Sequence, residues 1–471
     1  MLKIALRSFA HHRTAAIATG LVALVGTMLI TGMMSLLGTG LATSTAAADR
    51  TFLVQFPLIM GGWTVAIVLF AMVSTIGVAL GGRAGEIAGI RLVGATPRQV
   101  QGMLVVETAA VTAVMALPGL AGGHLVGWVI TRGLHAAGLT SAASAYAPGV
   151  LLPVLGVLVV LAASVLAAWI GSRSPAGRSP VADAAPPPPR RTSRTGPRRR
   201  TSRTEPPRRT SRTEPPPRSR TERRPGRGRR VAATLMIGAG LASSAAVFGM
   251  DPADILTTAM TGPGCVLVAA GLCVLAPELI ALVNLVLRAL RPAHRTAPAH
   301  LAAINLSAAP DRVRPTVTFL TLFVGVAAGT LSMQGIENAS GTAGSTGQVL
   351  ASINYFVVAL IAAFMAIALS NNLVASIARR RAEFAVMSLI GSTGGQTHRM
   401  LVREIGAATA VSVVAGSVGA FFAVLPFAVV KTGDPLQAAA PLPYAVTIAI
   451  GVGVTLGVSS LVGRRVIRTA A

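Results

Sequence analysis

The sequence "RAGEIAGIRLVGATPRQVQGMLVVE" occupies residues 83–107, between two long apolar runs. A near copy, "RRAEFAVMSLIGSTGGQTHRMLVRE", occupies residues 380–404 and also lies between apolar runs. The two stretches are offset by 297 positions and share 11 of 25 residues. A polar segment that recurs in two such surroundings indicates an internal repeat, and this repeat determines how the rest of the chain is divided.

The composition places these inserts in a membrane protein. The 471 residues have a mean hydropathy of +0.67, and only 12% of them are charged. A soluble protein of this size needs a more highly charged surface. Uncharged runs of roughly 20 residues, enough for a helix to cross a bilayer core of about 30 Å, recur along the chain. Because backbone groups in lipid must be satisfied within a segment, these runs are expected to be helices of an all-α integral membrane protein.

Ten spanning helices are predicted. Their approximate limits are 15–40, 56–80, 105–131, 149–171, 231–249, 259–287, 315–334, 354–377, 403–430 and 443–463. They group into two four-helix repeats, at 1–172 and 301–471, with two intervening helices inside 231–300. Equivalent points are separated by an even number of spans, so the repeats are parallel and related by a pseudo-two-fold axis along the membrane normal.

The basic residues orient the chain. With the N-terminus in the cytoplasm, 38 of the 41 Lys and Arg residues fall inside, and only Arg50, Arg132 and Lys431 fall outside. This asymmetry predicts a multi-pass plasma-membrane protein with both termini cytoplasmic. Glu278 falls near the inner end of the sixth predicted span, where we expect it to snorkel or to pair with Arg288.

Residues 173–230 form a basic linker between the first repeat and the intervening helices. The linker carries 19 arginines, four acidic residues and a Pro-containing nine-residue repeat that starts at Thr192. This composition predicts disorder. On the cytoplasmic face, the positive charge is expected to lie near anionic lipid, with a regulatory or partner contact as the alternative. Nucleic-acid binding is not expected, since the linker has no aromatic residues to stack on bases.

Both inserts carry the signals of a short helix, a tight turn and a second helix. An acidic residue and an apolar side start the short helix, and a glycine ends it as a C-cap. A Thr and a Gln three residues later form a capping box for the next helix. The apolar side is predicted to comprise Ile87, Ile90 and Leu92 in one copy, and Phe384, Met387 and Leu389 in the other.

The candidate site residues follow from this pattern. They are Arg83, Glu86, Gly94, Thr96, Gln99 and Glu107 in the first copy, and Arg380, Glu383, Gly391, Thr393, Gln396 and Glu404 in the second. A helix and turn at the membrane surface suit the transfer of force from a cytoplasmic partner. The same pattern also fits an interfacial segment that only connects two spans.

The duplicated insert resembles the FtsX-like permease family of ABC transporters, in the ten-helix, two-repeat form of the type VII or mechanotransmission class. The core R-x-x-E-x-A-x-x-x-L-x-G-x-T-x-x-Q at 83–99 and again at 380–396 carries the resemblance. The segments "LKIALRSFAHHR" and "HLAAINLSAAPDRVRP" also resemble the interfacial helix that precedes each repeat in that family. The resemblance covers both four-helix blocks.

The resemblance implies a separate cytoplasmic ABC ATPase that dimerises beneath the permease. The segments 83–99 and 380–396 would couple ATP hydrolysis to export of a hydrophobic or amphipathic substrate, or to mechanotransmission. Glu86 and Glu383 would pair with basic groups of the ATPase or with a local arginine; alternatively, they only favour the helix start. The large extracytoplasmic domain found in many members is missing here, so capture of a partner by such a domain is in doubt.

The chain is not expected to be an enzyme by itself. Its two lysines, Lys3 and Lys431, lie outside any G-x-x-x-x-G-K-[ST] loop, and no catalytic, cofactor or metal-ligating pattern is found. Two other functions remain open. An ion-driven secondary transporter predicts charged or polar residues at mid-membrane and broken helices, whereas most of these spans lack a central charge. A non-transporting regulator or sensor partner would couple to the ATPase through the same two segments.

Overall fold

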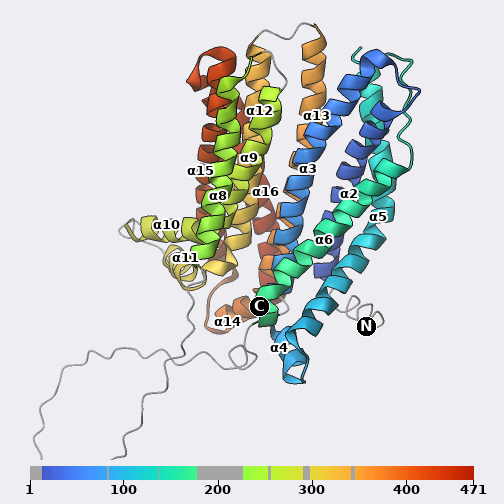
Figure 1. The fold of residues 1–471 in the computed structure, drawn as a ribbon. Helices are drawn as coiled ribbons and strands as arrows, with labels where there is room; N and C mark the ends of the chain where they lie inside the picture. The colour runs from blue at the N-terminus through green and yellow to red at the C-terminus, as the bar shows by residue number, and fades with distance from the viewer. Residues whose placement is uncertain are drawn as a thin grey trace, which may run out of the picture.

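The computed structural model describes residues 13–81, 84–136, 138–177, 226–252, 256–289, 297–340 and 345–470. Every regular element in these ranges is a helix, which confirms the predicted all-α class (Figure 1). The elements are α2 (Arg13–Leu41), α3 (Ala47–Gly81), α4 (Ala84–Leu92), α5 (Pro97–Ala136), α6 (Leu151–Gly177), α8 (Gly226–Ala245), η1 (Ala246–Gly249), α9 (Leu256–Val274), α10 (Ala276–Ala289), α11 (Ala297–Ala308), η3 (Pro310–Arg312), α12 (Arg314–Ala339), α13 (Ser345–Ala378), α14 (Arg381–Leu389), α15 (Gly394–Thr432), η4 (Pro435–Ala439) and α16 (Pro441–Ala470).

The internal repeat is visible in the helix boundaries. Helices α4 and α14 begin and end 297 positions apart, and α3 and α13 end 297 positions apart. Helices α2, α3, α5 and α6 form one half of the bundle, and α12, α13, α15 and α16 belong to the other (Figure 1). The offset found between the two inserts therefore extends over most of each repeat.

The bundle has the dimensions of a membrane domain. Nine helices of the described chain are long and apolar enough to cross a bilayer. The span predicted at 354–377 is not among these nine. It lies within α13, a helix of 34 residues that completes the second repeat. These elements form a multi-pass membrane protein.

The predicted span at 259–287 is wrong in its second half. Helix α9 ends at Val274, and after Leu275 the chain turns into α10, which runs across the axes of the spanning helices (Figure 1). Pro277 has no N–H to donate to the carbonyl of Cys273, so the helical ladder is weakened at this point. The correction shortens the sixth span and leaves α10 outside the bundle of spanning helices.

The limits of the basic linker also change. Both ends of the predicted disordered segment 173–230 are helical, because α6 continues to Gly177 and α8 begins at Gly226. The remainder of the linker, 178–225, lies outside the described residues, as do most of the segment "LKIALRSFAHHR" and Arg83. The corresponding segment before the second repeat does contain a helix, α11.

The intervening helices pack on the second repeat. Helix α9 contacts α12 and α15, and α8 packs on α9. Helices α9 and α12 come close together at small residues. The backbone of Gly325 faces Ala269, and that of Gly329 faces Cys265. Close packing through small side chains is the usual way in which helices associate where lipid removes the hydrophobic driving force.

Candidate functional site

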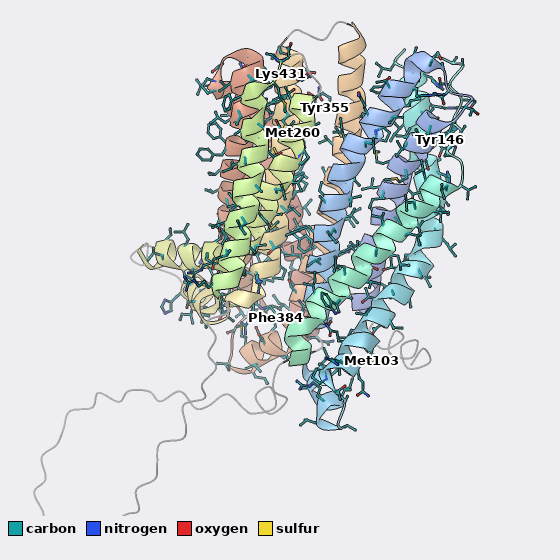
Figure 2. The ribbon with its side chains drawn as sticks, viewed as in Figure 1. Met103, Tyr146, Met260, Tyr355, Phe384 and Lys431 are labelled. Carbon is teal, nitrogen blue, oxygen red and sulfur yellow. The ribbon has the colours of Figure 1, made fainter. Side chains whose placement is uncertain are left out.

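The two duplicated inserts lie at one end of the molecule, which we call the elbow end. We call α4 with the turn into α5 the first elbow, and α14 with the turn into α15 the second elbow. Helices α5 and α15 have 40 and 39 residues, so each is about 60 Å long, roughly twice the thickness of a bilayer core. Met103 and Phe384 mark the elbow end in Figure 2, and Lys431 marks the opposite end. Each elbow is thus joined without a break to a membrane-spanning helix.

The turn of each elbow has the predicted glycine cap. Gly94 and Gly391 have φ angles of 105° and 96°, in the left-handed region that favours glycine. The residue after each glycine donates its N–H to a carbonyl five positions back, from Ala95 to Ile90 at 3.3 Å and from Ser392 to Met387 at 3.0 Å. This bond is typical of a Schellman cap, and it fixes the same sharp turn in both copies.

The next helix starts with the predicted capping box in both elbows. The Gln99 Oε1 accepts from the Thr96 N–H at 2.9 Å, and the Thr96 hydroxyl oxygen accepts from the Gln99 N–H at 3.3 Å. The equivalent distances for Thr393 and Gln396 are 3.0 and 3.3 Å. Reciprocal caps satisfy two N–H groups at a helix start. The cap and the turn together orient each short helix relative to the long helix that follows.

A buried ion pair joins the two helices of the second elbow. The Arg380 guanidinium donates to both oxygens of Glu404, with Nη1–Oε1 at 3.1 Å and Nη2–Oε2 at 2.9 Å. Both side chains are almost fully buried. Such a bidentate arrangement fixes direction as well as distance. The end of α13 is thereby tied to the third turn of α15.

The same arginine extends the network outward. Its Nε lies 3.3 Å from Glu383 Oε2, and the other oxygen of Glu383 lies 2.6 Å from Arg312 Nη2. Arg312 belongs to η3, which precedes α12. The Arg380 guanidinium also lies 5.4 Å from the ring centroid of Phe384, which is buried. Four charged groups therefore link the start of α12, the end of α13, α14 and α15.

The structure describes the first elbow less completely. Arg83 lies outside the described residues. Glu86 is exposed in the first turn of α4, and Glu107 is partly buried on α5 at the position equivalent to Glu404. Arg312 has no counterpart in the first repeat, since the equivalent position is Ala15. The two elbows are alike in their glycine turns and capping boxes.

The predicted apolar sides of the short helices are only partly buried. Ile87 and Phe384 face the core, whereas Ile90, Leu92 and Leu389 are 38%, 59% and 88% exposed. The next residues, Val93 and Ile390, are 91% and 78% exposed. Because the chain turns at the following glycine, these residues point away from the bundle. We call the two pairs, Leu92 with Val93 and Leu389 with Ile390, the elbow tips.

Exposed basic side chains occur on the elements next to the tips. Arg98 lies in the first turn after the first elbow, and Arg399 follows the second elbow. The last turns of α16, which packs against α14, add Arg464, Arg465 and Arg468. All five side chains are exposed. Apolar tips within a basic surface would suit a protein partner that offers apolar grooves edged by acidic residues.

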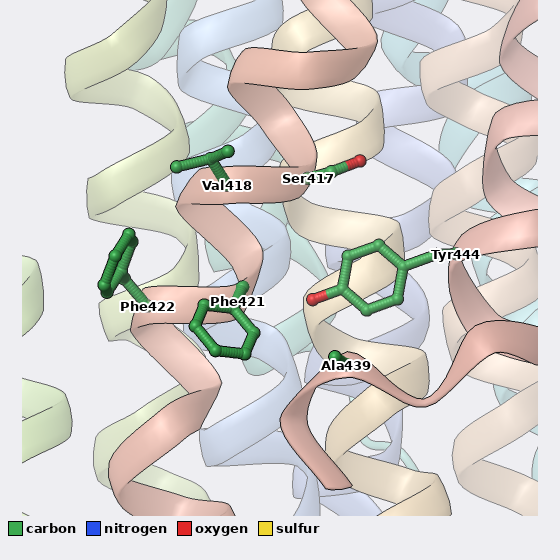
Figure 3. Close-up of a pocket in the computed structure, with 6 residues that line it drawn as sticks. All are labelled: Ser417, Val418, Phe421, Phe422, Ala439 and Tyr444. Carbon is green, nitrogen blue, oxygen red and sulfur yellow. The ribbon is translucent and has the colours of Figure 1, made fainter. Parts of the chain in front are cut away.

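A small pocket lies between α15 and α16, away from the elbows. Its volume is about 260 Å³, and Tyr444 reaches from α16 toward α15 across it (Figure 3). The Tyr444 O–H donates to the carbonyl of Ala438 at 3.1 Å. The lining residues are Ser417, Val418, Phe421, Phe422, Ala439 and Tyr444. With no charged group in its lining, this pocket fits an apolar guest.

The sequence located the elbow glycines, caps and acidic residues, but it missed two features. Arg312 lies outside the duplicated insert, and only the fold brings it to Glu383. The exposure of the tips was also missed, although a signal was present: each glycine cap is preceded by two large apolar residues, Leu-Val or Leu-Ile. An apolar pair directly before a turn extends beyond the face that a short helix can bury.

Comparison with known proteins agrees with the duplicated architecture. A family model described as FtsX-like permease C-terminal matches residues 58–180 and again residues 355–470. The two matches start 297 positions apart, like the two inserts, and together they cover slightly more than half of the chain. A search of curated proteins finds no match.

Proposed function

Because the chain belongs to the FtsX-like permease family and is therefore a permease subunit of the ABC transporter type, we propose that its two elbows dock on a separate cytoplasmic ABC ATPase. ATP binding and hydrolysis in that partner would move the elbows. The long helices α5 and α15 would carry the motion across the membrane, either to export a hydrophobic or amphipathic substrate or to transmit force.

The single observation that carries this proposal is the pair of exposed apolar tips. Leu92, Val93, Leu389 and Ile390 lie at equivalent positions, 297 apart, and all four are more than half exposed. Each tip ends in a rigid cap rather than a loose loop. Large apolar side chains held in water on a fixed support favour a partner that buries them. Two tips related by pseudo-symmetry suit a dimeric partner with two equivalent grooves.

The internal contacts of the second elbow support force transfer. The Arg380–Glu404 pair and the Arg380–Glu383–Arg312 chain connect α14 to α12, α13 and α15. A load applied at α14 would therefore reach three long helices. In this proposal Glu383 forms ion pairs within the permease. The tips and the arginines next to them contact the ATPase.

The proposed orientation places the elbow end in the cytoplasm. The arginine-rich ends of α8 and α16 lie at this end, together with the basic surroundings of the tips. The positive-inside rule favours this arrangement in the cell membrane.

The test is recovery of an ATPase from the native membrane. The tagged chain is solubilised gently, and co-purifying proteins are identified by mass spectrometry. The test variant carries Asp at all four tip positions. Burial of one large apolar side chain contributes roughly 1.5–3 kcal/mol, so replacing the tips is expected to weaken ATPase binding more than about a hundredfold.

The matched control is Leu436→Asp, which places the same charge at an exposed apolar position in η4, far from the elbows. This variant is expected to recover the ATPase like the unmodified chain. Equal recovery with the tip variant would show that the tips do not dock. No ATPase with any chain, across several detergents, would contradict the proposal and favour an ion-driven transporter.

A further inference from the structure

Helix α10 is an unusual element because its apolar side is wider than the surface it buries. One face is buried: Ala276, Ile280 and Val283 pack into a cluster formed with α11, α12 and α15. The rest of the apolar side carries Leu282, Leu285 and Val286, which are 50%, 64% and 49% exposed. Their spacing of three and four residues puts them on one stripe. A helix whose exposed side is apolar is not expected to face water along that side.

An ion-pair clamp fixes the height of α10 relative to the membrane. Glu278 in its first turn lies 2.6 Å from Arg229 Nη2 and 2.9 Å from Arg230 Nε. Burial alone raises the pKa of Glu278, but the hydrogen bonds from Arg230 and Arg229 outweigh this effect and hold its pKa below the ordinary value. The carboxylate is therefore charged at neutral pH, and the clamp is closed.

The two arginines of the clamp mark the membrane boundary of α8. They belong to the first turns of a candidate span that runs from Arg227 to Gly249. Directly beyond them, Val231 and Leu235 are exposed apolar residues on the outer face of α8. That face is in contact with lipid in a membrane-spanning helix. The clamp therefore puts the first turn of α10 where the apolar surface of the bundle begins.

Basic residues flank α10 in the sequence. Arg288 is the second-last residue of α10, and Arg291 and Arg295 follow the helix in the sequence. The arginine-rich segment 178–225 precedes α8 in the sequence. Arginines next to an apolar helix in the sequence are typical of a helix that lies in a membrane interface and contacts anionic headgroups.

We infer that α10 is an in-plane membrane anchor whose stripe, Leu282, Leu285 and Val286, inserts into the leaflet on the elbow side. The occupant of this surface is the bilayer itself, in continuity with the lipid-facing side of α8. The anchor holds the inner end of α9 at a fixed depth beside the second elbow. This inference is independent of whether an ATPase binds.

The test measures the depth of α10 in the full chain. A nitroxide is attached to Leu285→Cys in a background with Cys265→Ala and Cys273→Ala, and the protein is reconstituted in nanodiscs that contain phosphatidylcholine and phosphatidylglycerol. Collisions of the label with oxygen, which concentrates in lipid, are compared with collisions with a water-soluble nickel chelate. The chain offers two matched controls: Leu117→Cys on the exposed mid-span face of α5, and Leu389→Cys at an elbow tip.

The label at position 285 is expected to behave like that at 117, with collisions dominated by oxygen. A label at 285 as accessible to nickel as that at 389 would overturn the inference, because the stripe would then lie in water or await a protein partner. All three label positions are exposed, so attaching a label there removes no core contact. The buried Cys265→Ala and Cys273→Ala changes are common to all three samples, so any effect they have on folding is the same in each.

Discussion

At the scale of single residues, the most constrained group of the candidate site is the Arg380 guanidinium. It faces the buried Glu404 carboxylate through two hydrogen bonds and reaches Glu383 with its remaining nitrogen. Taking two charges out of water is costly, and only good geometry offsets that cost. The pair is therefore a poor source of stability in itself, but its disruption leaves a buried charge without compensation.

The first prediction concerns Arg380→Ala. This variant is expected to destabilise the protein by about 3–5 kcal/mol, because the Glu404 carboxylate loses its bidentate partner in a buried place. Thermal unfolding in detergent, followed by circular dichroism, measures the change. Arg381→Ala is the matched control: this neighbouring arginine is exposed and donates to the Thr469 carbonyl at 2.7 Å. Its loss is expected to cost less than about 1.5 kcal/mol.

A double variant separates pairing from packing. Combining Arg380→Ala with Glu404→Leu removes both charges, so most of the lost stability is expected to return. A double variant as unstable as Arg380→Ala would contradict the view that the uncompensated carboxylate causes the loss. The acidic partners were visible in the sequence because they recur at the same offset. Arg312 was not, since its contact with Glu383 joins positions 71 apart in the chain.

At the scale of elements, α2 and α5 pack through a row of small residues. Gly119, Gly123 and Gly127 on α5 recur every four positions, and each faces α2. A Cβ at Gly123 would lie 2.6 Å from the Cβ of Thr31 and 2.9 Å from the Met28 carbonyl oxygen. The two backbones therefore approach as closely as glycine permits, as in other membrane helix pairs.

The second prediction uses this close approach. Gly123→Ala is expected to destabilise the protein by about 1–3 kcal/mol, because α2 must move away from α5. Gly133→Ala is the control on the same helix, where an added Cβ meets nothing within 4 Å. That change is expected to be neutral or to stabilise by up to about 1 kcal/mol, since alanine favours the helix. The same thermal measurement checks both; similar melting temperatures for the two variants would contradict the packing argument.

The elements also show where local patterns fail. The length of the apolar run predicted one helix through 259–287, but the chain bends after Leu275. Pro277 was a visible warning, yet Pro57, Pro118 and Pro426 lie inside helices that continue through them. The difference lies in tertiary contacts: the Glu278 clamp and the packing of Ile280 on α11, α12 and α15 stabilise the bent path.

At the scale of the whole molecule, the two repeats meet on their pseudo-symmetry axis. The Asn372 Nδ2 donates to the Thr75 hydroxyl oxygen at 3.2 Å, and these residues are 297 positions apart. Equivalent residues of two repeats can contact each other only where the axis passes between them. Both side chains are buried in the region where α3 and α13 lie side by side (Figure 1). The contact therefore marks the line about which the repeats would rock.

The third prediction tests that motion and rests on the proposed ATPase coupling. Thr75→Cys with Asn372→Cys, joined by a short cleavable thiol reagent, is expected to hold the repeats together and to lower substrate- or permease-stimulated ATP hydrolysis at least about tenfold. Reduction of the cross-link is expected to restore it. A specific protease site in 178–225 reports the cross-link, because the two halves then stay together after cleavage.

The two single-cysteine variants are the controls, and they are expected to keep full activity after the same treatment. Unchanged hydrolysis in a fully cross-linked sample would show that the repeats do not separate along α3 and α13 during turnover. The coupling route would then have to run within each repeat.

The sequence by itself determined what depends on neighbouring residues: the apolar spans, the duplicated elbows, and the glycine and capping-box signals at 94–99 and 391–396. These are local rules, because a helix satisfies its own backbone and a cap involves residues three to five positions apart. The offset of 297 added the relation between the two halves without any structure.

Only the tertiary structure decided what depends on residues far apart in the chain. It turned α10 out of the bundle, brought Arg312 to Glu383, exposed the elbow tips and placed Thr75 against Asn372. Each outcome is set by which faces of different helices pack together. In a membrane protein nearly every helix is apolar on most sides, so the pattern of one segment does not reveal which side meets lipid, another helix or a partner.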